Sequence, residues 1–361
     1  MDGIFYYCDD GTRFTSKVKA LHHARQYNTK VHFYYHDDVY SKQDWKTEPP
    51  HTLDFYYREQ AQRIRDSYDY VILCYSGGYD SSNILETFYY NNIKLDKIIT
   101  VGALSQDSAF GVDENHNGEL YHNVFPYLKE LGLDSITQVC DYTDYFSNMD
   151  NFSITVHGDD WVDHTGAWFS PHNWFWKDIE RYVVPKEWHG KRVALLFGKD
   201  KPSLFYYRAP TTENLPIGPL RLNSFCFRDT PCTSYGNSSG LDNCDRINFY
   251  WDPASPEILI KQLHLMYKVY QISQTSGYEA SVGSQLLSNV DTNSIVYNLR
   301  RPILFKSPKS KDNILSLRDT YLKDKHNSDV YDMYSAGLAN IDRTAGLNNM
   351  KPIQTKFYPI V

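Results

Sequence analysis

The chain has 361 residues and a formal net charge of -7 at pH 7, a length that allows a large core and two or three structural units. Hydrophobic residues make up 41% and charged residues 22%, which is the ordinary balance of a soluble globular protein. The acidic charge argues against a general nucleic-acid binder, because phosphate contacts need clustered Lys and Arg. The net charge does not rule out a local basic surface.

The N-terminus has neither a basic start nor a long apolar run, so no secretory signal is expected. No window approaches the apolar length that crosses a bilayer. The six cysteines are scattered along the chain, and reduced, buried thiols are the favoured interpretation. Together these observations predict a cytoplasmic protein with no membrane partner.

Two residue types leave alternatives open. Cys226, Cys232 and Cys244 lie in a Gly/Asn/Ser-rich segment, where zinc is the alternative to free thiols, although no Cys-x-x-Cys pair is present and no fourth ligand is evident. Tyrosine is abundant, with 31 residues, many of them in pairs. Packing in strands and interfaces is the favoured interpretation of these pairs, and stacking on nucleic-acid bases is the alternative.

Residues 1–50 predict a small N-terminal α/β unit. Residues 3–7 and 31–35 read as strands, and residues 17–27 read as a helix with apolar side chains along one side. Pro49 and Pro50 mark its boundary. The sequence therefore predicts a central domain over residues 51–248 and a mainly helical region over residues 249–361.

The central domain is organised around residues 71–88. The apolar run at 71–75 predicts a strand buried on both faces, and an amphipathic helix over residues 81–90 follows it. Between them, Gly77 and Gly78 allow a tight turn that brings backbone N–H groups against a ligand. The helix N-terminus and these amides together favour an anion, most naturally a phosphate.

This turn carries a specific motif, Ser76-Gly77-Gly78-Tyr79-Asp80-Ser81, with Ser82 as an additional hydroxyl. It resembles the S-G-G-x-D-S signature of the PP-loop ATP pyrophosphatases, the adenine nucleotide alpha-hydrolase superfamily. The resemblance is closest to the synthetase domain of asparagine synthetases, in the stand-alone form found in bacteriophages, which would place a viral protein in the host cytoplasm. It implies that ATP is cleaved to AMP and pyrophosphate and that this motif binds the phosphates.

Strands and helices alternate after the motif. Strands at residues 97–101 and 136–140, with a helix at 121–131 between them, predict a doubly wound, mostly parallel sheet. The resemblance implies that this sheet is of the HUP / PP-loop type. In the family, the end of the first of these strands lies against the adenine. The resemblance therefore implies that Val101 and Gly102 bind the base.

A second motif follows the apolar strand at residues 193–197. Gly198 and Asp200 match in spacing the G-x-G-x-D-E motif of the asparagine-synthetase group, which implies that Asp200 holds Mg²⁺ together with Asp80. One or two carboxylates plus phosphate oxygens form the usual magnesium site in proteins. Lys199 and Lys201 are expected to neutralise charge on the leaving pyrophosphate, with a solvated loop cation as the alternative for each.

The stretch between residues 141 and 190 is harder to interpret. His157 to His164 and His172 supply metal-ligand residue types, interleaved with tryptophans. A packed aromatic loop is the favoured interpretation, and a substrate-facing loop and a metal site are the alternatives. Further on, residues 256–271 read as a helix that begins the C-terminal region, which would cover one side of the nucleotide site.

The resulting hypothesis is an AMP-forming amide ligase that uses ATP and Mg²⁺ to activate a carboxylate or amide oxygen for attack by an amine. Its acceptor is an unidentified small molecule or nucleobase. Position two holds Asp2 rather than the cysteine nucleophile of glutaminase domains, so ammonia from glutamine is not expected. The alternatives are a nucleobase- or tRNA-modifying PP-loop enzyme and a catalytically inactive nucleotide-binding regulator.

Overall fold

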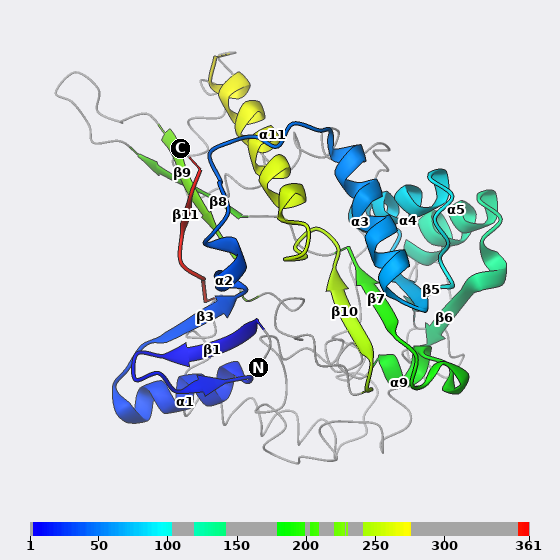
Figure 1. Cartoon of the computed structure of the whole chain (residues 1–361), viewed down its shortest axis with the longest axis horizontal. Coiled ribbons are helices and arrows are strands. Elements are labelled where there is room, and N and C mark those ends of the chain that lie inside the picture. Colours follow the sequence, from blue (N-terminus) through cyan, green and yellow to red (C-terminus); the bar gives the residue numbers. More distant parts are fainter. Residues whose placement is uncertain are drawn as a thin grey trace.

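The computed structural model describes residues 3–102, 119–141, 179–198, 203–208, 220–227, 229, 241–275 and 353–360. Over these residues the chain is an α/β protein with a five-stranded parallel sheet flanked by helices and a small N-terminal antiparallel sheet (Figure 1). A third sheet has three strands in the order β11-β9-β8. The predictions of a parallel central sheet and an N-terminal α/β unit are confirmed.

The N-terminal sheet has the strand order β2-β1-β3, and both outer strands run antiparallel to β1. Its elements are β1 (Ile4–Cys8), β2 (Arg13–Phe14), α1 (Lys17–Tyr27), β3 (Val31–Tyr35) and α2 (Asp37–Tyr40). Helix α1 begins after Ser16, whose Oγ accepts a hydrogen bond from the Lys19 N–H at 3.3 Å. It ends at Asn28, which takes the left-handed conformation with φ 50°.

The central sheet has the strand order β10-β7-β4-β5-β6, and every pair in it is parallel. Its strands are β4 (Tyr70–Cys74), β5 (Lys97–Gly102), β6 (Thr137–Asp141), β7 (Val193–Phe197) and β10 (Cys244–Asn248). The first three strands along the chain extend to one side, and the fourth and fifth are added on the other. The direction of winding therefore reverses between β4 and β7.

Helices connect and flank these strands. They are α3 (Leu53–Ser67), α4 (Tyr79–Tyr90), a π-helix (Glu119–Val124), α5 (Phe125–Glu130), two 3₁₀ turns (Asp134–Ile136 and Lys186–Trp188), α9 (Glu180–Val183) and α11 (Pro256–Thr275). In Figure 1, α3, α4 and α5 lie together beside β4 to β6, and α11 extends away from the end of β10.

Two helices differ from their predicted limits. Helix α4 begins at Tyr79 instead of Ser81, because Gly78 is the N-cap residue in an extended conformation and Asp80 already lies in the first turn. The helix predicted over 121–131 is a π-helix that changes to α5 near Pro126. Proline has no N–H to donate in a regular helical ladder, and the hydrogen-bond pattern changes at this point.

The third sheet joins the C-terminal strand to the rest of the molecule. It contains β8 (Ser203–Arg208), β9 (Leu220–Cys226) and β11 (Tyr358–Pro359), and β9 pairs antiparallel with both neighbours. The Phe225 and Tyr358 rings stack with centroids 5.3 Å apart. Strand β11 therefore packs through its side chains as well as through its backbone pairing.

One continuous hydrophobic core connects the three sheets. It includes Tyr35 of the N-terminal sheet, Leu73 of the central sheet, and Phe225 and Tyr358 of the third. The Tyr35 and Phe227 ring centroids lie 4.6 Å apart. Residues 3–50 are thus packed against segments more than 175 positions further along the chain.

A buried ion pair joins the same regions. The Lys17 ammonium lies 2.7 Å from the Asp229 carboxylate, and both side chains have 1% or less of their surface exposed. Asp229 also accepts hydrogen bonds from Tyr6 Oη at 3.1 Å and from the Ile353 N–H at 2.6 Å. Burial lowers the pKa of Lys17 and raises the pKa of Asp229.

The cysteines follow the sequence-based expectation where the structure describes them. Cys8, Cys74, Cys140, Cys226 and Cys244 are all buried and none forms a disulfide. Cys226 lies in β9 and Cys244 in β10, so these two belong to different sheets. Cys232 lies outside the described residues.

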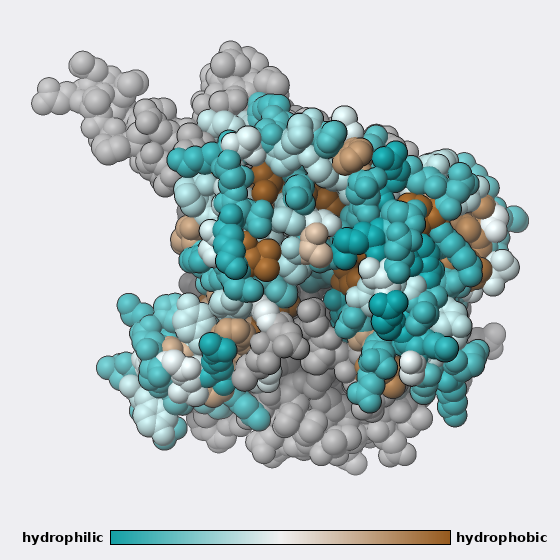
Figure 2. Space-filling view, in the orientation of Figure 1, coloured by the Kyte–Doolittle hydropathy of each residue, from teal (hydrophilic) through white to brown (hydrophobic). Residues whose placement is uncertain are grey.

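The face of the molecule drawn in Figure 2 is mostly hydrophilic over the described residues, with hydrophobic residues scattered among them. Such scattered apolar residues are ordinary on protein surfaces. None of the described helices combines the length and apolar character that a membrane crossing requires.

Candidate functional site

The loop after β4 begins as an extension of the sheet. The Tyr75 N–H donates to the Ile99 carbonyl of β5 at 2.7 Å, and the chain then turns sharply over residues 76–78. Gly77 has φ +73°, and a Cβ atom built there would lie 2.8 Å from Val124 Cγ2. Both the backbone conformation and the lack of space require glycine at this position.

Serine hydroxyls hold the loop in shape. Ser81 Oγ accepts a hydrogen bond from the Ser76 N–H at 3.2 Å and donates to the Gly78 carbonyl at 3.1 Å. Ser82 Oγ lies 3.2 Å from the Tyr75 hydroxyl. Ser81 and Ser82 are buried, whereas Ser76 is exposed. Ser76 Oγ lies 3.2 Å from Ser81 Oγ and accepts a hydrogen bond from the Gly78 N–H at 3.4 Å, so it shapes the loop as well.

The first turn of α4 faces the same place. Its N-cap residue is Gly78, and no side chain caps the helix there. The first N–H groups of an α-helix have no intrahelical acceptor and carry the positive end of the helix dipole. Tyr79 and Asp80 in this turn are half-buried. The geometry suits an anion at the loop amides. One oxygen of the Asp80 carboxylate, Oδ1, is buried.

Gly198 brings the second motif to this turn. It follows β7, and a Cβ atom built on it would lie 2.9 Å from the backbone carbon of Asp80 and 2.9 Å from the Ser81 nitrogen. The loops after β4 and β7 therefore meet where the winding of the sheet reverses. In open parallel sheets, this crevice at the carboxyl ends of the strands is where ligands bind.

Lys199, Asp200 and Lys201 lie outside the described residues. The predicted magnesium pair, Asp80 with Asp200, is thus described at Asp80 alone. Gly198 stands two residues before Asp200 and is in contact with the Asp80 backbone.

Val101 and Gly102 end β5 at the same edge of the sheet. Strand β5 pairs with β4 through Cys74 and Ile99, and with β6 through Gly102 and Asp141. Gly102 is buried and Val101 is half-buried. Both predicted base-binding residues therefore lie on β5, the strand beside β4 and the loop at residues 76–78.

Tyr250 contacts the site although the sequence analysis did not select it. This fully buried residue follows β10, and its hydroxyl donates to the Asp80 carbonyl at 2.8 Å. The hydroxyl also accepts a hydrogen bond from Asn83 Nδ2 at 2.9 Å. Burial raises the pKa of Tyr250 well above its ordinary value, so the phenol stays a neutral donor. No local sequence pattern links residues 80 and 250; only the tertiary fold does.

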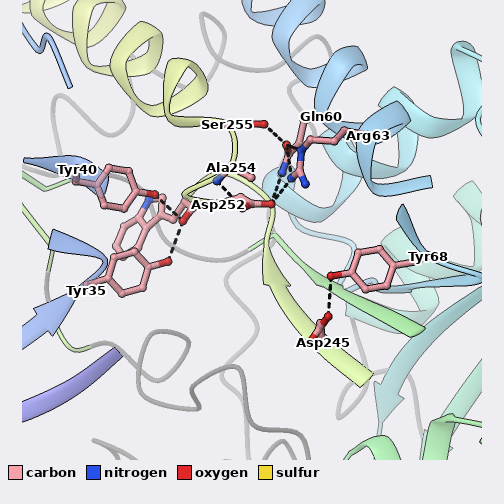
Figure 3. A network of polar contacts seen from close by, with 10 residues as sticks. Tyr35, Tyr40, Gln60, Arg63, Tyr68, Asp245, Asp252, Ala254 and Ser255 are labelled. Carbon is pink, nitrogen blue, oxygen red and sulfur yellow. Dashed lines mark hydrogen bonds and ion pairs between the residues drawn. The ribbon is translucent and has the colours of Figure 1, made fainter. Parts of the chain in front are cut away.

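The next two residues hold other elements of the molecule (Figure 3). The Trp251 carbonyl accepts hydrogen bonds from Tyr35 Oη at 3.0 Å and Tyr40 Oη at 2.8 Å. The Asp252 carboxylate accepts from Gln60 Nε2 on α3 at 2.8 Å and forms an ion pair with Arg63. Residues 250–252 therefore connect the candidate site, the N-terminal unit and α3. We call this segment the junction.

Helix α4 also packs through a second buried polar contact. Tyr127 Oη of α5 donates to the Glu86 carboxylate at 2.6 Å, and both side chains are buried. Burial, together with this carboxylate, raises the pKa of Tyr127 far above its ordinary value. Burial also raises the pKa of Tyr75 to about 12, so its hydroxyl stays neutral beside Ser82.

The donors at this site fit Mg²⁺ and a phosphate chain. Mg²⁺ prefers oxygen ligands and keeps several waters, and the Asp80 carboxylate and the exposed Ser76 hydroxyl are oxygen donors. The contact between Gly198 and the α4 backbone leaves no room for a side chain, which keeps two loop backbones close together. The stretch from His157 to His172 lies outside the described residues.

No protein-family model matches this chain, and no curated protein is significantly similar to it. The motif residues and their geometry are therefore the basis for inferring a function.

Proposed function

We propose that this protein is a PP-loop ATP pyrophosphatase that acts as an AMP-forming amide ligase. The observation that carries the proposal is the contact of Gly198 with the Asp80 and Ser81 backbone, at the point where the winding of the sheet reverses. It brings the two loops with the family's phosphate and magnesium motifs together. The strand order also supports the doubly wound arrangement of this superfamily.

Each part of the site has a role in this proposal. The segment of residues 76–82, which includes the first turn of α4, binds the pyrophosphate portion of ATP. It does so through backbone N–H groups and the Ser76 hydroxyl. Asp80 and Asp200 hold Mg²⁺, which neutralises phosphate charge. Val101 and Gly102 lie against the adenine. Lys199 and Lys201 stabilise the charge that develops on the leaving pyrophosphate.

The acceptor follows from Lys201. The family motif has a glutamate at this position, which can take a proton from an attacking ammonium ion. A lysine is cationic unless its pKa falls strongly, so it suits an anionic group better than it suits the role of general base. We therefore infer an acceptor or nucleophile other than aspartate and ammonia, and no asparagine synthesis from aspartate, ATP and ammonium.

The test is incubation of the full chain with labelled ATP, Mg²⁺ and a metabolite extract. We expect AMP and pyrophosphate in equal amounts and a new amide product. Asp80→Asn should lower turnover about a hundredfold or more, whereas Asp54→Asn, in the exposed first turn of α3, should leave it unchanged.

Three other outcomes would contradict the proposal in different ways. ADP and orthophosphate without AMP would mean a different bond is cleaved. ATP binding without turnover in any extract would favour a nucleotide-binding regulator. AMP formation that requires added RNA, with RNA binding at physiological salt, would favour a nucleobase-modifying enzyme.

A further inference from the structure

Three potential metal ligands come together in the N-terminal unit, away from the candidate nucleotide site. Cys8 ends β1, Asp10 lies in the turn that follows, and His23 projects from α1. Their ligand atoms, one sulfur, one carboxylate oxygen and one ring nitrogen, all lie within 4.8 Å of one another. Neither the sequence motifs nor the proposed ligase reaction uses these residues.

The turn holds two of the three ligands in place. The Cys8 N–H donates to the Thr12 carbonyl at 3.0 Å, and the Cys8 carbonyl accepts from the Gly11 N–H at 2.8 Å. Asp10 uses Oδ1 to accept a hydrogen bond from the Thr12 N–H at 2.9 Å. Its other oxygen, Oδ2, lies 2.6 Å from His23 Nε2. A metal ligand whose second atom is hydrogen-bonded in this way is oriented in advance.

The third ligand is held by aromatic neighbours. The His23 ring centroid lies 5.1 Å from that of Phe14 and 4.5 Å from that of Tyr27. Both rings limit how the imidazole can rotate, so Nε2 stays directed toward Asp10. His23 and Asp10 have 19% and 40% of their side-chain surface exposed, and an ion from solvent can reach them.

We propose that Cys8, Asp10 and His23 form a binding site for a divalent transition metal of the zinc type. Thiolate, imidazole and carboxylate are the ligand types that Zn²⁺ takes, at about 2.0 to 2.3 Å. A tetrahedral arrangement with these bond lengths puts ligand atoms about 3 to 4 Å apart, so small side-chain adjustments from the present spacing of up to 4.8 Å close the site. Water completes the fourth position. Soft sulfur favours this class of ion over Mg²⁺ or Ca²⁺.

The charge and proton balance also fits. Thiolate and carboxylate together supply two negative charges, which match a divalent ion. On binding, the thiol proton is released to solvent, and the Nε2 proton that His23 donates to Asp10 is also lost, so that Nε2 coordinates the ion while Nδ1 carries the proton of the neutral ring. The exposed Asp9 carboxylate stands next to Asp10 in sequence and adds negative charge.

The experiment uses the full chain, stripped with a chelator and kept reduced with a phosphine. Titration with Co²⁺ should produce a thiolate-to-cobalt charge-transfer band that saturates at one equivalent and disappears when Zn²⁺ is added. Cys8→Ser should abolish the band. His23→Gln should weaken Co²⁺ affinity at least tenfold, whereas His22→Gln, its neighbour on α1 with similar exposure, should bind as the wild type does.

A second measurement covers the case in which Cys8→Ser does not fold. Zn²⁺ should raise the Tm of the wild type and of His22→Gln, and should raise the Tm of His23→Gln much less. No charge-transfer band in the wild type would overturn the proposal. A band that persists unchanged in both Cys8→Ser and His23→Gln would overturn it too, because the ion would then be bound elsewhere.

Discussion

At Gly198 the lack of a side chain is a structural requirement. Its substitution by alanine would put Cβ 2.9 Å from two backbone atoms of α4, and a helix backbone cannot move as a flexible side chain does. We expect Gly198→Ala to shift the first turn of α4 and to weaken ATP binding by tenfold or more. Nucleotide titration of the full chain measures this directly.

A matched variant separates the local effect from general destabilisation. Gly132 has φ +67° and open space around it, so Gly132→Ala should cost about 1 kcal/mol of stability without changing ATP affinity. Equal nucleotide affinity in Gly198→Ala and the wild type would mean that this contact does not shape a nucleotide site.

Tyr250 carries a second prediction at the scale of single residues. Tyr250→Phe keeps the ring but removes the hydroxyl that serves the Asp80 carbonyl and the Asn83 amide. Buried polar groups that lose a partner cost about 1 to 3 kcal/mol, so the free energy of unfolding should fall by that amount in a denaturant titration. Under the proposed function, ATP affinity should fall as well. Unchanged stability would contradict the hydrogen-bond assignment.

The elements that local patterns predict are those with a clear apolar period or cap. The apolar side of residues 17–27 predicts helix α1 over its full range, and the structure adds Ser16 and Asn28 as its caps. Strand β7 is predicted because all five of its residues are apolar. Strand β10 is not predicted, because Asp245 and Arg246 interrupt its apolar pattern. Arg246 is only 7% exposed, and its burial depends on a partner that is distant in sequence.

That partner is Glu180 of α9, which pairs with Arg246 through both carboxylate oxygens. Glu180→Gln removes the compensating charge from a buried guanidinium, and we expect a loss of about 3 to 5 kcal/mol in the free energy of unfolding. The double variant Glu180→Leu with Arg246→Met should lose less than this single change. If the double variant is less stable than Glu180→Gln, then the ion pair contributes stability beyond neutralising the buried charge of Arg246.

Helix α11 is tied to the N-terminal unit by surface ion pairs. Glu48 lies 2.7 Å from Lys261 and 2.6 Å from Lys268, and these lysines hold the pKa of Glu48 at about 2, below its ordinary value of 4.5. The ion pairs that lower the pKa of Glu48 stabilise the fold fully above about pH 4.5. This stabilisation is lost as the pH falls through about 2.

Glu48→Gln should therefore be less stable than the wild type at pH 7, by under about 1 kcal/mol because the pair is partly exposed. The difference should shrink between pH 4.5 and 2. Denaturant titrations of both proteins at several pH values measure it. A difference that grows toward acid pH would show that another group carries the effect.

At the scale of the whole molecule, the N-terminal unit is part of the common core. Lys17→Met would leave the Asp229 carboxylate buried beside a neutral side chain, and breaking a buried pair in this way costs about 3 to 5 kcal/mol. Lys19→Met, two positions along the same helix and exposed, should have almost no effect. Tm measurements of the two variants decide whether residues 3–50 stabilise the rest of the chain.

The arrangement of the sheets was beyond sequence reasoning for a physical reason. Strand order depends on pairings between segments far apart in the chain, such as β4 with β7, and no local pattern encodes them. The motif at residues 76–82 could be recognised, because the turn and the helix start are local there. The contacts of Gly198 and Tyr250 with the first turn of α4 arise only when the whole sheet has formed.

The junction at residues 250–252 also has a consequence for energetic communication. Its three consecutive residues hold the first turn of α4, the N-terminal tyrosines and α3. Free-energy coupling between two binding sites is reciprocal. If a ligand of the N-terminal unit changes the affinity of the α4 turn for its own ligand through the junction, then the ligand at α4 changes the affinity of the N-terminal unit by the same factor. Amide hydrogen exchange at residues 35–40, measured with and without ATP, would report the coupling from a distance.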